Sequence, residues 1–72
     1  MTKYFVVTVE TPAGRKFVGS PSSILTADPN EAGCITDDFI DEVFGYWNIQ
    51  SGGKADILKL EEFEALRAEN LL

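Results

Sequence analysis

Side chains that could carry out a reaction are scarce in this sequence. Its 72 residues include no histidine, the commonest general base and metal ligand, and a single cysteine, Cys34. Cys34 has neither a histidine for a reactive thiolate pair nor a second cysteine for a disulfide, and we expect it to be a small buried hydrophobic residue. No lysine stands in a recognisable phosphate-binding or Schiff-base motif, and so short a chain offers little concavity for desolvating a pair of carboxylates. We therefore expect no catalytic activity and no cofactor.

The segment that begins at Asn48 has the glycine spacing of a calcium-binding loop but lacks its ligands. If the loop starts at Asn48, Gly53 occupies the sixth position, where such loops have glycine. Gln50 and Gly52 stand at the third and fifth positions, and Lys59 stands at the twelfth, where a bidentate glutamate is required. We interpret this segment as a surface turn and expect no metal site.

Carboxylates dominate the charge of the chain. Twelve Asp and Glu oppose six Lys and Arg, which gives a formal net charge of −6. Residues 1–27 carry three bases and one acid, a net +2, whereas residues 28–72 carry three bases and eleven acids, a net −8. This charge opposes direct binding of nucleic acid or anionic lipid and favours a protein partner with a basic surface. Because the chain starts with strand-like residues and has no apolar run of the ~20 residues that span a bilayer, we expect a cytoplasmic protein.

Two groups of acids could meet such a partner, together with one aromatic residue of the type that dominates interface energies. These candidate partner-binding residues are Asp37, Asp38, Asp41, Glu42, Glu61, Glu62 and Trp47. Two interpretations stay open for the acids, a solvated surface that keeps a small protein soluble or a negative patch that binds a partner. Trp47 also has two, because a tryptophan in so small a domain more often packs in the core.

The amino-terminal part of the chain predicts a β-hairpin. Residues 3–11 are rich in β-branched and aromatic types that alternate between two faces. One face has Phe5, Val7 and Val9, and the other has Tyr4, Val6, Thr8 and Glu10. Residues 12–14 supply the turn, and residues 15–19 return as the antiparallel partner.

Shorter elements follow the hairpin. Residues 20–23 have turn chemistry, and residues 24–26 predict a short third strand. Asp28 is a suitable N-cap with Pro29 at the first helical position, which predicts one helical turn ending at Gly33.

A longer helix is predicted over residues 37–47, with Thr36 as its N-cap. At helical spacing, one half of its surface is apolar and faces a core, while the four acids face water. The apolar half comprises Ile35, Phe39, Ile40, Val43, Phe44, Tyr46 and Trp47. Acids four residues apart repel by about 0.2–0.5 kcal/mol per pair, and acids near a helix N-terminus gain about 0.3–1 kcal/mol each, so the two effects are comparable.

The last third of the chain predicts an extended segment and a second helix. Residues 56–60 favour the extended segment, and an amphipathic helix then runs to about Glu69. Together the elements describe one α+β domain over residues 1–72. We expect a small antiparallel β-sheet, made of the N-terminal hairpin and the third strand, packed against two C-terminal helices that cover one face.

Two functions fit this sequence. The favoured one is a small inhibitor or adaptor that blocks a basic nucleic-acid-binding surface of a larger protein complex by nucleic-acid mimicry. In size and acidity, and in no motif, the chain resembles small virus-encoded antagonists of bacterial defence such as anti-CRISPR proteins. The alternative is a structural or oligomerisation module that pairs through the edge strand of the hairpin, at Tyr4, Val6 and Thr8. The oligomeric state is open between monomer and homodimer.

Overall fold

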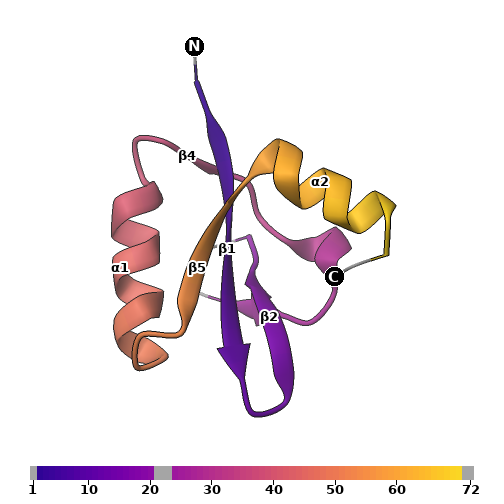
Figure 1. Ribbon diagram of the computed structural model, residues 1–72. Coiled ribbons are helices and arrows are strands. Elements are labelled where there is room, and N and C mark those ends of the chain that lie inside the picture. The colour runs from indigo at the N-terminus through magenta and orange to yellow at the C-terminus, as the bar shows by residue number, and fades with distance from the viewer. Residues whose placement is uncertain (1, 21–23, 71–72) are drawn as a thin grey trace.

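The computed structural model of the chain describes residues 2–20 and 24–70 and has the expected α+β fold, a curled antiparallel sheet with two helices in the C-terminal half (Figure 1). The elements in chain order are β1 (Tyr4–Thr11), β2 (Gly14–Val18), β3 (Leu25–Thr26), the 3₁₀ turn η1 (Pro29–Glu31), β4 (Ile35–Thr36), α1 (Ile40–Gln50), β5 (Ala55–Lys59) and α2 (Leu60–Ala68). The predicted turn at residues 20–23 falls largely outside the described residues.

Strand β1 lies at the centre of the sheet. One of its edges pairs with β5 from Phe5 to Val9, and its other edge pairs with β4 near the start and with β2 near the end. The prediction that Tyr4, Val6 and Thr8 belong to a free edge strand is therefore wrong, since Val6 lies opposite Leu58 and Thr8 opposite Asp56. Strand β1 therefore does not offer an open edge along Val6 and Thr8.

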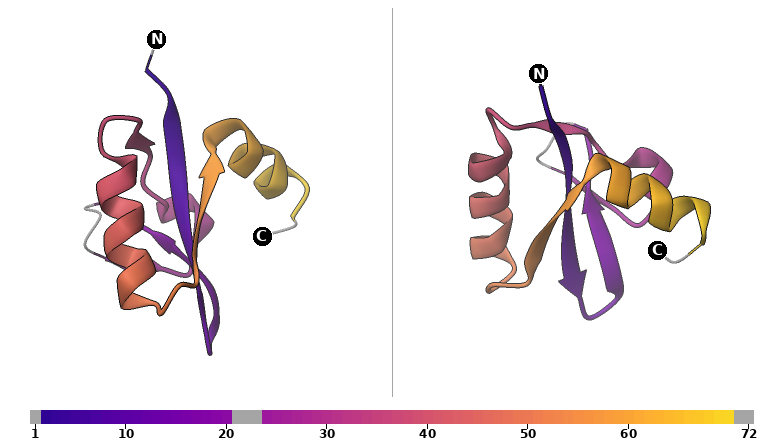
Figure 2. Two further views of the ribbon diagram at one scale, coloured as in Figure 1. Left: turned by 60° about the vertical axis from the view of Figure 1, so that its left-hand side comes forward. Right: turned by 45° about the horizontal axis from the view of Figure 1, so that its top comes forward.

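The two faces of β1 serve two separate cores. Val7 and Val9 pack with Ile40 and the partly buried side chains of α1, whereas Val6 packs with Phe17 of β2 and with α2. The helices thus cover opposite faces of the sheet, not one face as predicted (Figure 2). The reason is that fully buried valines stand on both faces of β1, Val6 on one and Val7 on the other, so each face needs a cover.

Helix α2 is attached to the sheet through an aromatic pair. Phe63 is its one buried residue among those described, and its ring meets Phe17 edge to face at 5.7 Å between centroids. The guanidinium of Arg67 lies 5.7 Å from the centroid of the same ring, within range of a cation–π contact. Burial of a phenylalanine side chain contributes about 1.5–3 kcal/mol, which makes Phe63 the main anchor of α2.

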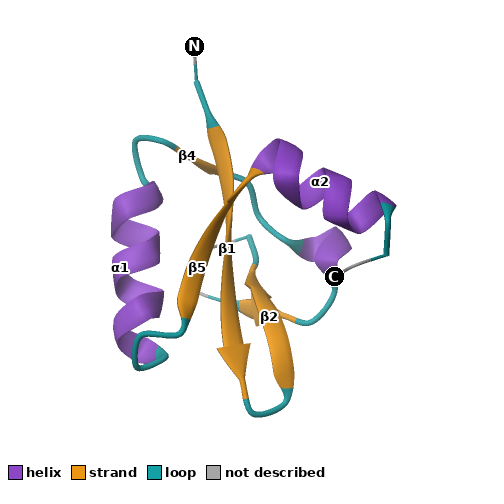
Figure 3. Ribbon diagram, viewed as in Figure 1, coloured by secondary structure: helices purple, strands orange, loops and turns teal. Residues whose placement is uncertain are grey.

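Helix α1 begins later than predicted. Thr36 belongs to β4, opposite Tyr4, and the Asp37 N–H donates to the Lys3 carbonyl at 3.1 Å. The pairing of Thr36 and Asp37 with β1 therefore extends the sheet into the segment where the helix was predicted to start. Residues 37–39 form a turn, α1 starts at Ile40 with no side-chain cap, and it continues to Gln50 (Figure 3).

The other local predictions are confirmed within small shifts of boundary. The hairpin turn has Gly14 at φ 113°, and the Thr11 hydroxyl donates to the Gly14 carbonyl at 2.6 Å. The Asp28 carboxylate accepts from the Asn30 N–H at 2.9 Å and caps η1, which ends at Glu31.

In the later part of the chain, α1 is followed by the predicted reversal, with Gly52 and Gly53 at positive φ, and then by β5 and α2. Cys34 is exposed, so its predicted burial is wrong. It lies between the 3₁₀ turn and β4, where the adjacent Ile35 takes the buried position.

Candidate protein-binding surface

Both helices start at the same end of the molecule. Helix α1 follows β4, which pairs with Tyr4 and Phe5, and α2 follows Lys59, which pairs with Phe5 (Figure 1). The first turns of the two helices thus flank the amino-terminal end of β1, although about twenty residues separate them in the sequence. We call this region the acidic end, and its carboxylates are Asp37, Asp38, Asp41, Glu42, Glu61 and Glu62.

The carboxylates of the acidic end are all exposed and none forms an ion pair with another described residue. The ion pair found in the described part of the chain joins Arg15 to Glu10 at 2.9 Å, beside the hairpin turn at the opposite end. Asp41, Glu42, Glu61 and Glu62 lie in first helical turns, where each gains about 0.3–1 kcal/mol from the helix dipole before salt screening. The helix starts therefore stabilise the negative charges of these acids without pairing them with a base.

The geometry differs from the single acidic helix face that the sequence predicted. Asp37 and Asp38 lie in the turn before α1, so the predicted repulsion at helical spacing with Asp41 and Glu42 does not apply. The pairing of β5 with β1 brings Glu61 and Glu62 to the same end of the sheet, but on α2, which covers the opposite face. The acids of the acidic end therefore lie on two helix starts that cover opposite faces of the sheet.

Two lysines reduce the negative charge at this end. Lys3 and Lys59 border a hollow of about 360 Å³, whose lining also includes Tyr4, Leu60 and Glu61. Neither lysine approaches a described carboxylate closely enough for an ion pair. The end keeps an excess of acids over bases, with six carboxylates against these two lysines.

Trp47 is not brought to the acidic end. It is half-buried, packs against the core beneath α1, and meets the Tyr46 ring edge to face at 5.1 Å between centroids. It lies five residues beyond Glu42 on the same helix, about 7 Å along the axis. The structure therefore favours the core interpretation of Trp47.

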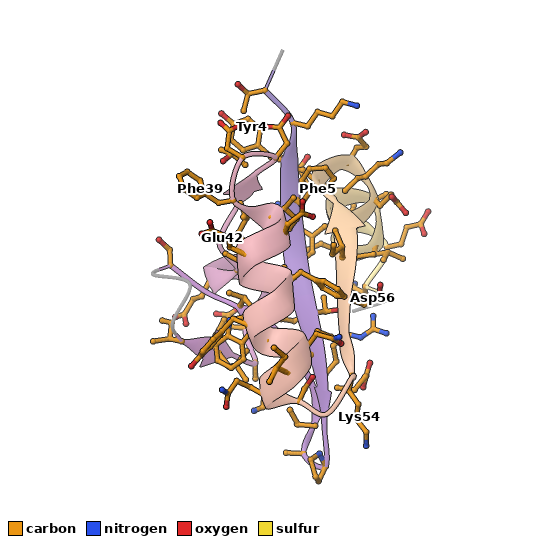
Figure 4. The ribbon with its side chains drawn as sticks, turned by 90° about the vertical axis from the view of Figure 1, so that its left-hand side faces the viewer. Tyr4, Phe5, Phe39, Glu42, Lys54 and Asp56 are labelled. Atoms are coloured by element: carbon orange, nitrogen blue, oxygen red, sulfur yellow. The ribbon has the colours of Figure 1, made fainter. Side chains whose placement is uncertain are left out.

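Several apolar side chains that the sequence assigned to the core are exposed instead. Phe39 and Tyr46 are 59% and 53% exposed, and Ile49, which the sequence left unassigned, is 79% exposed. Figure 4, which looks onto α1, shows Phe39 and Glu42 along one edge of the helix, with Tyr4, 46% exposed, at the same end of the molecule. One signal was available in the sequence, because Ile49 falls on the polar half of the helix, where an isoleucine has no core to fill.

The exposed carboxylates of the acidic end are acceptors for cationic groups of another molecule. Among the residues at 2–20 and 24–70, no group of three or more Cys, Asp or Glu is placed to hold a metal ion. Neither described helix has the length and apolar character needed to cross a membrane.

Comparison with protein-family models, with curated proteins and with solved structures finds no match to this chain. Its function is therefore inferred from the surface described above.

Proposed function

We propose that the protein binds a basic surface of a larger protein or complex through its acidic end and blocks that surface against nucleic acid. The observation that carries the proposal is the gathering of six exposed carboxylates from two helix starts, none of them ion-paired with a described residue. Carboxylate oxygens spread over one end of a small domain offer a basic groove the same kind of acceptor as backbone phosphates.

The opposite end of the molecule supports this orientation. Arg15 and Lys16 lie at the hairpin and Lys54 lies beside it, its carbonyl accepting from the Glu10 N–H. The molecule is thus polarised, with a basic end and an acidic end. A basic partner attracts the acidic end during the encounter, and this attraction weakens as salt screens it.

The role as an inhibitor is the finer part of the proposal. A domain of 72 residues with net charge −6 has the size and charge to occupy a groove without spanning the whole complex. Antagonism of a nucleic-acid-dependent defence system, in the manner of anti-CRISPR proteins, is the form of inhibition that we propose on these two properties.

The test is capture of partners from a lysate of the native host, followed by displacement and mutation. Nucleic acid added in excess should release the captured protein, and binding should weaken at least ten-fold between about 0.05 and 0.5 M salt, where the Debye length shrinks several-fold. The charge reversals Asp38→Lys and Glu42→Lys together should remove binding and leave the unfolding midpoint nearly unchanged.

A matched control reverses Glu64 and Glu69 to lysine, which gives the same change in net charge in the later part of α2 and just after it. This control should keep most of the affinity. Full binding by the Asp38→Lys, Glu42→Lys variant, or equal losses in both variants, would show that the acidic end is not the contact surface.

A further inference from the structure

The outer side of α1 carries an exposed apolar ridge. Of the five large hydrophobic residues that are exposed among those described, Phe39, Tyr46 and Ile49 lie within one stretch of the chain, at 59%, 53% and 79% exposure. With Glu42 they recur at steps of three and four residues, so they follow one line along the helix. We define the α1 ridge as Phe39, Glu42, Tyr46 and Ile49.

The fold does not require this ridge. Ile40 is buried beneath α1, and Phe44 and Trp47 pack against the same core, which is enough to fix the helix on the sheet. Scattered exposed hydrophobic residues are ordinary, but a row of them on one side of one helix marks a contact surface.

The surface beside α1 has a hollow toward each end of the helix. One hollow of about 280 Å³ is lined by Phe39 and Val43 together with part of the β4 region. Another of about 270 Å³ is lined by Trp47, Gln50 and Leu25. Raised side chains next to hollows give a helix from another protein places for its own side chains.

The charge of residues 37–53 indicates which kind of molecule binds the α1 ridge. Residues 37–53 contain four carboxylates and neither lysine nor arginine. A second copy of the chain, packed on the ridge by two-fold symmetry, would set these acids against one another. A partner with positive charge is attracted instead, because its lysines and arginines face Glu42 and the turn at Asp38.

We infer that the α1 ridge docks an amphipathic helix of the partner, with an apolar face against Phe39, Tyr46 and Ile49 and with Lys or Arg flanking that face. From Phe39 to Ile49 the ridge extends about 15 Å, which matches roughly three turns of a partner helix. This inference rests on the proposed function for the basic character of the partner. It adds that part of the affinity is apolar and resists salt.

The experiment uses a synthetic helical peptide of about 15 residues, with leucines on one face and lysines on the other, and a scrambled peptide of identical composition. Binding to the full chain is measured by calorimetry at about 0.05 and 0.5 M salt. The amphipathic peptide should bind at least ten-fold more tightly than the scrambled one, and this preference should persist at high salt.

The double variant Tyr46→Ser, Ile49→Ser removes apolar area from the ridge without changing charge. It should reduce the preference for the amphipathic peptide by ten-fold or more. Ile24→Ser is the matched control, because Ile24 is 48% exposed and lies just before β3, outside the ridge. This variant should bind as the parent does, and unfolding midpoints of all variants confirm that they are folded.

The two proposals fail in different ways. Equal binding of both peptides, unaffected by the Tyr46→Ser, Ile49→Ser change but lost on reversal of Asp38 and Glu42, overturns the ridge and keeps the acidic end. Loss of binding in the ridge variant with no effect of charge reversal or salt overturns the acidic end. Self-association of the parent chain that disappears in the ridge variant overturns the amphipathic helix as the occupant.

Discussion

Gly33 lies where the segment before β4 closely approaches the end of β2. Its N–H donates to the Val18 carbonyl at 2.9 Å, which ties the segment before β4 to the end of β2. A Cβ at this position would lie 2.6 Å from the carbonyl oxygen of Gly19 and 2.9 Å from its carbonyl carbon. Both neighbours are backbone atoms, so they cannot move aside as a side-chain tip can, and only glycine fits.

We predict that Gly33→Ala lowers the free energy of unfolding by about 1–3 kcal/mol, the usual cost of forcing extra atoms into a packed site. Gly45→Ala is the control, since a Cβ at Gly45, inside α1, would meet no atom within 4 Å. It should raise the free energy of unfolding by about 0.5–1 kcal/mol, because alanine is the better helix former. Urea unfolding of the two variants measures both values, and an unchanged Gly33→Ala variant would contradict the close approach.

At the scale of elements, β5 forms one edge of the sheet, with β1 as its strand partner. The Glu10 N–H donates to the Lys54 carbonyl at 3.1 Å, and because antiparallel hydrogen bonds alternate, the N–H of Ile57 points away from β1. The Asp56 carboxylate accepts from this N–H at 2.9 Å. An acidic side chain thus occupies the donor that a second strand would need, one of the ways in which proteins protect an edge.

We predict that Asp56→Ala favours self-association through β5, by about ten-fold in the dimerisation constant, because an unsatisfied donor and one less charge remain at the edge. Asp56→Asn keeps an acceptor for the Ile57 N–H while removing the charge, so it separates the two effects. Sedimentation velocity over a range of concentrations measures the association. Identical sedimentation of Asp56→Ala and the parent would show that the carboxylate does not prevent strand pairing at β5.

The elements that the sequence predicts well are those decided by neighbours in the chain. The hairpin turn at Gly14, the cap at Asp28 and the passage from β5 to α2 each depend on residues only a few positions apart. The start of α1 depends instead on Thr36 pairing with Tyr4, thirty-two positions away, and no local pattern at Thr36 reports that contact.

Some features of the candidate surface could likewise be predicted from the sequence, and others could not. The acids were identifiable from their types, and their exposure follows from their charge. Their location at one end was not predictable, because it depends on β5 pairing with β1, which places the start of α2 at the amino-terminal end of β1. The sequence did hold one signal of a sheet covered on both sides, since Val6 stands on the face that otherwise carries Thr8 and Glu10.

At the scale of the whole molecule, both cores depend on one strand. Val6 and Val7 are fully buried on opposite faces of β1, and β1 has strand partners on both edges. Opening of either helix from the sheet leaves β1 in place, whereas loss of β1 removes both cores together.

We predict that the amide hydrogens of Val6, Thr8 and Val9 exchange with solvent more slowly than any others, at rates set by global unfolding. The amides of residues 37–39 should exchange faster by orders of magnitude, because they lie in an exposed turn. Hydrogen exchange followed by NMR checks this order. Equal protection of β1 and the short strand β3 would contradict a central role for β1.

The order of residues along β1 fixes its alignment with β2. A slip of one position would carry Glu10 to the face where Val7 and Val9 pack with α1, and only at Val6 and Val7 would one valine replace another. The turn supports the same alignment, because Gly14 has φ 113° and the Thr11 hydroxyl donates to the Gly14 carbonyl. Since the hairpin leaves the ribosome before either helix, these residues align β1 with β2 before either core exists.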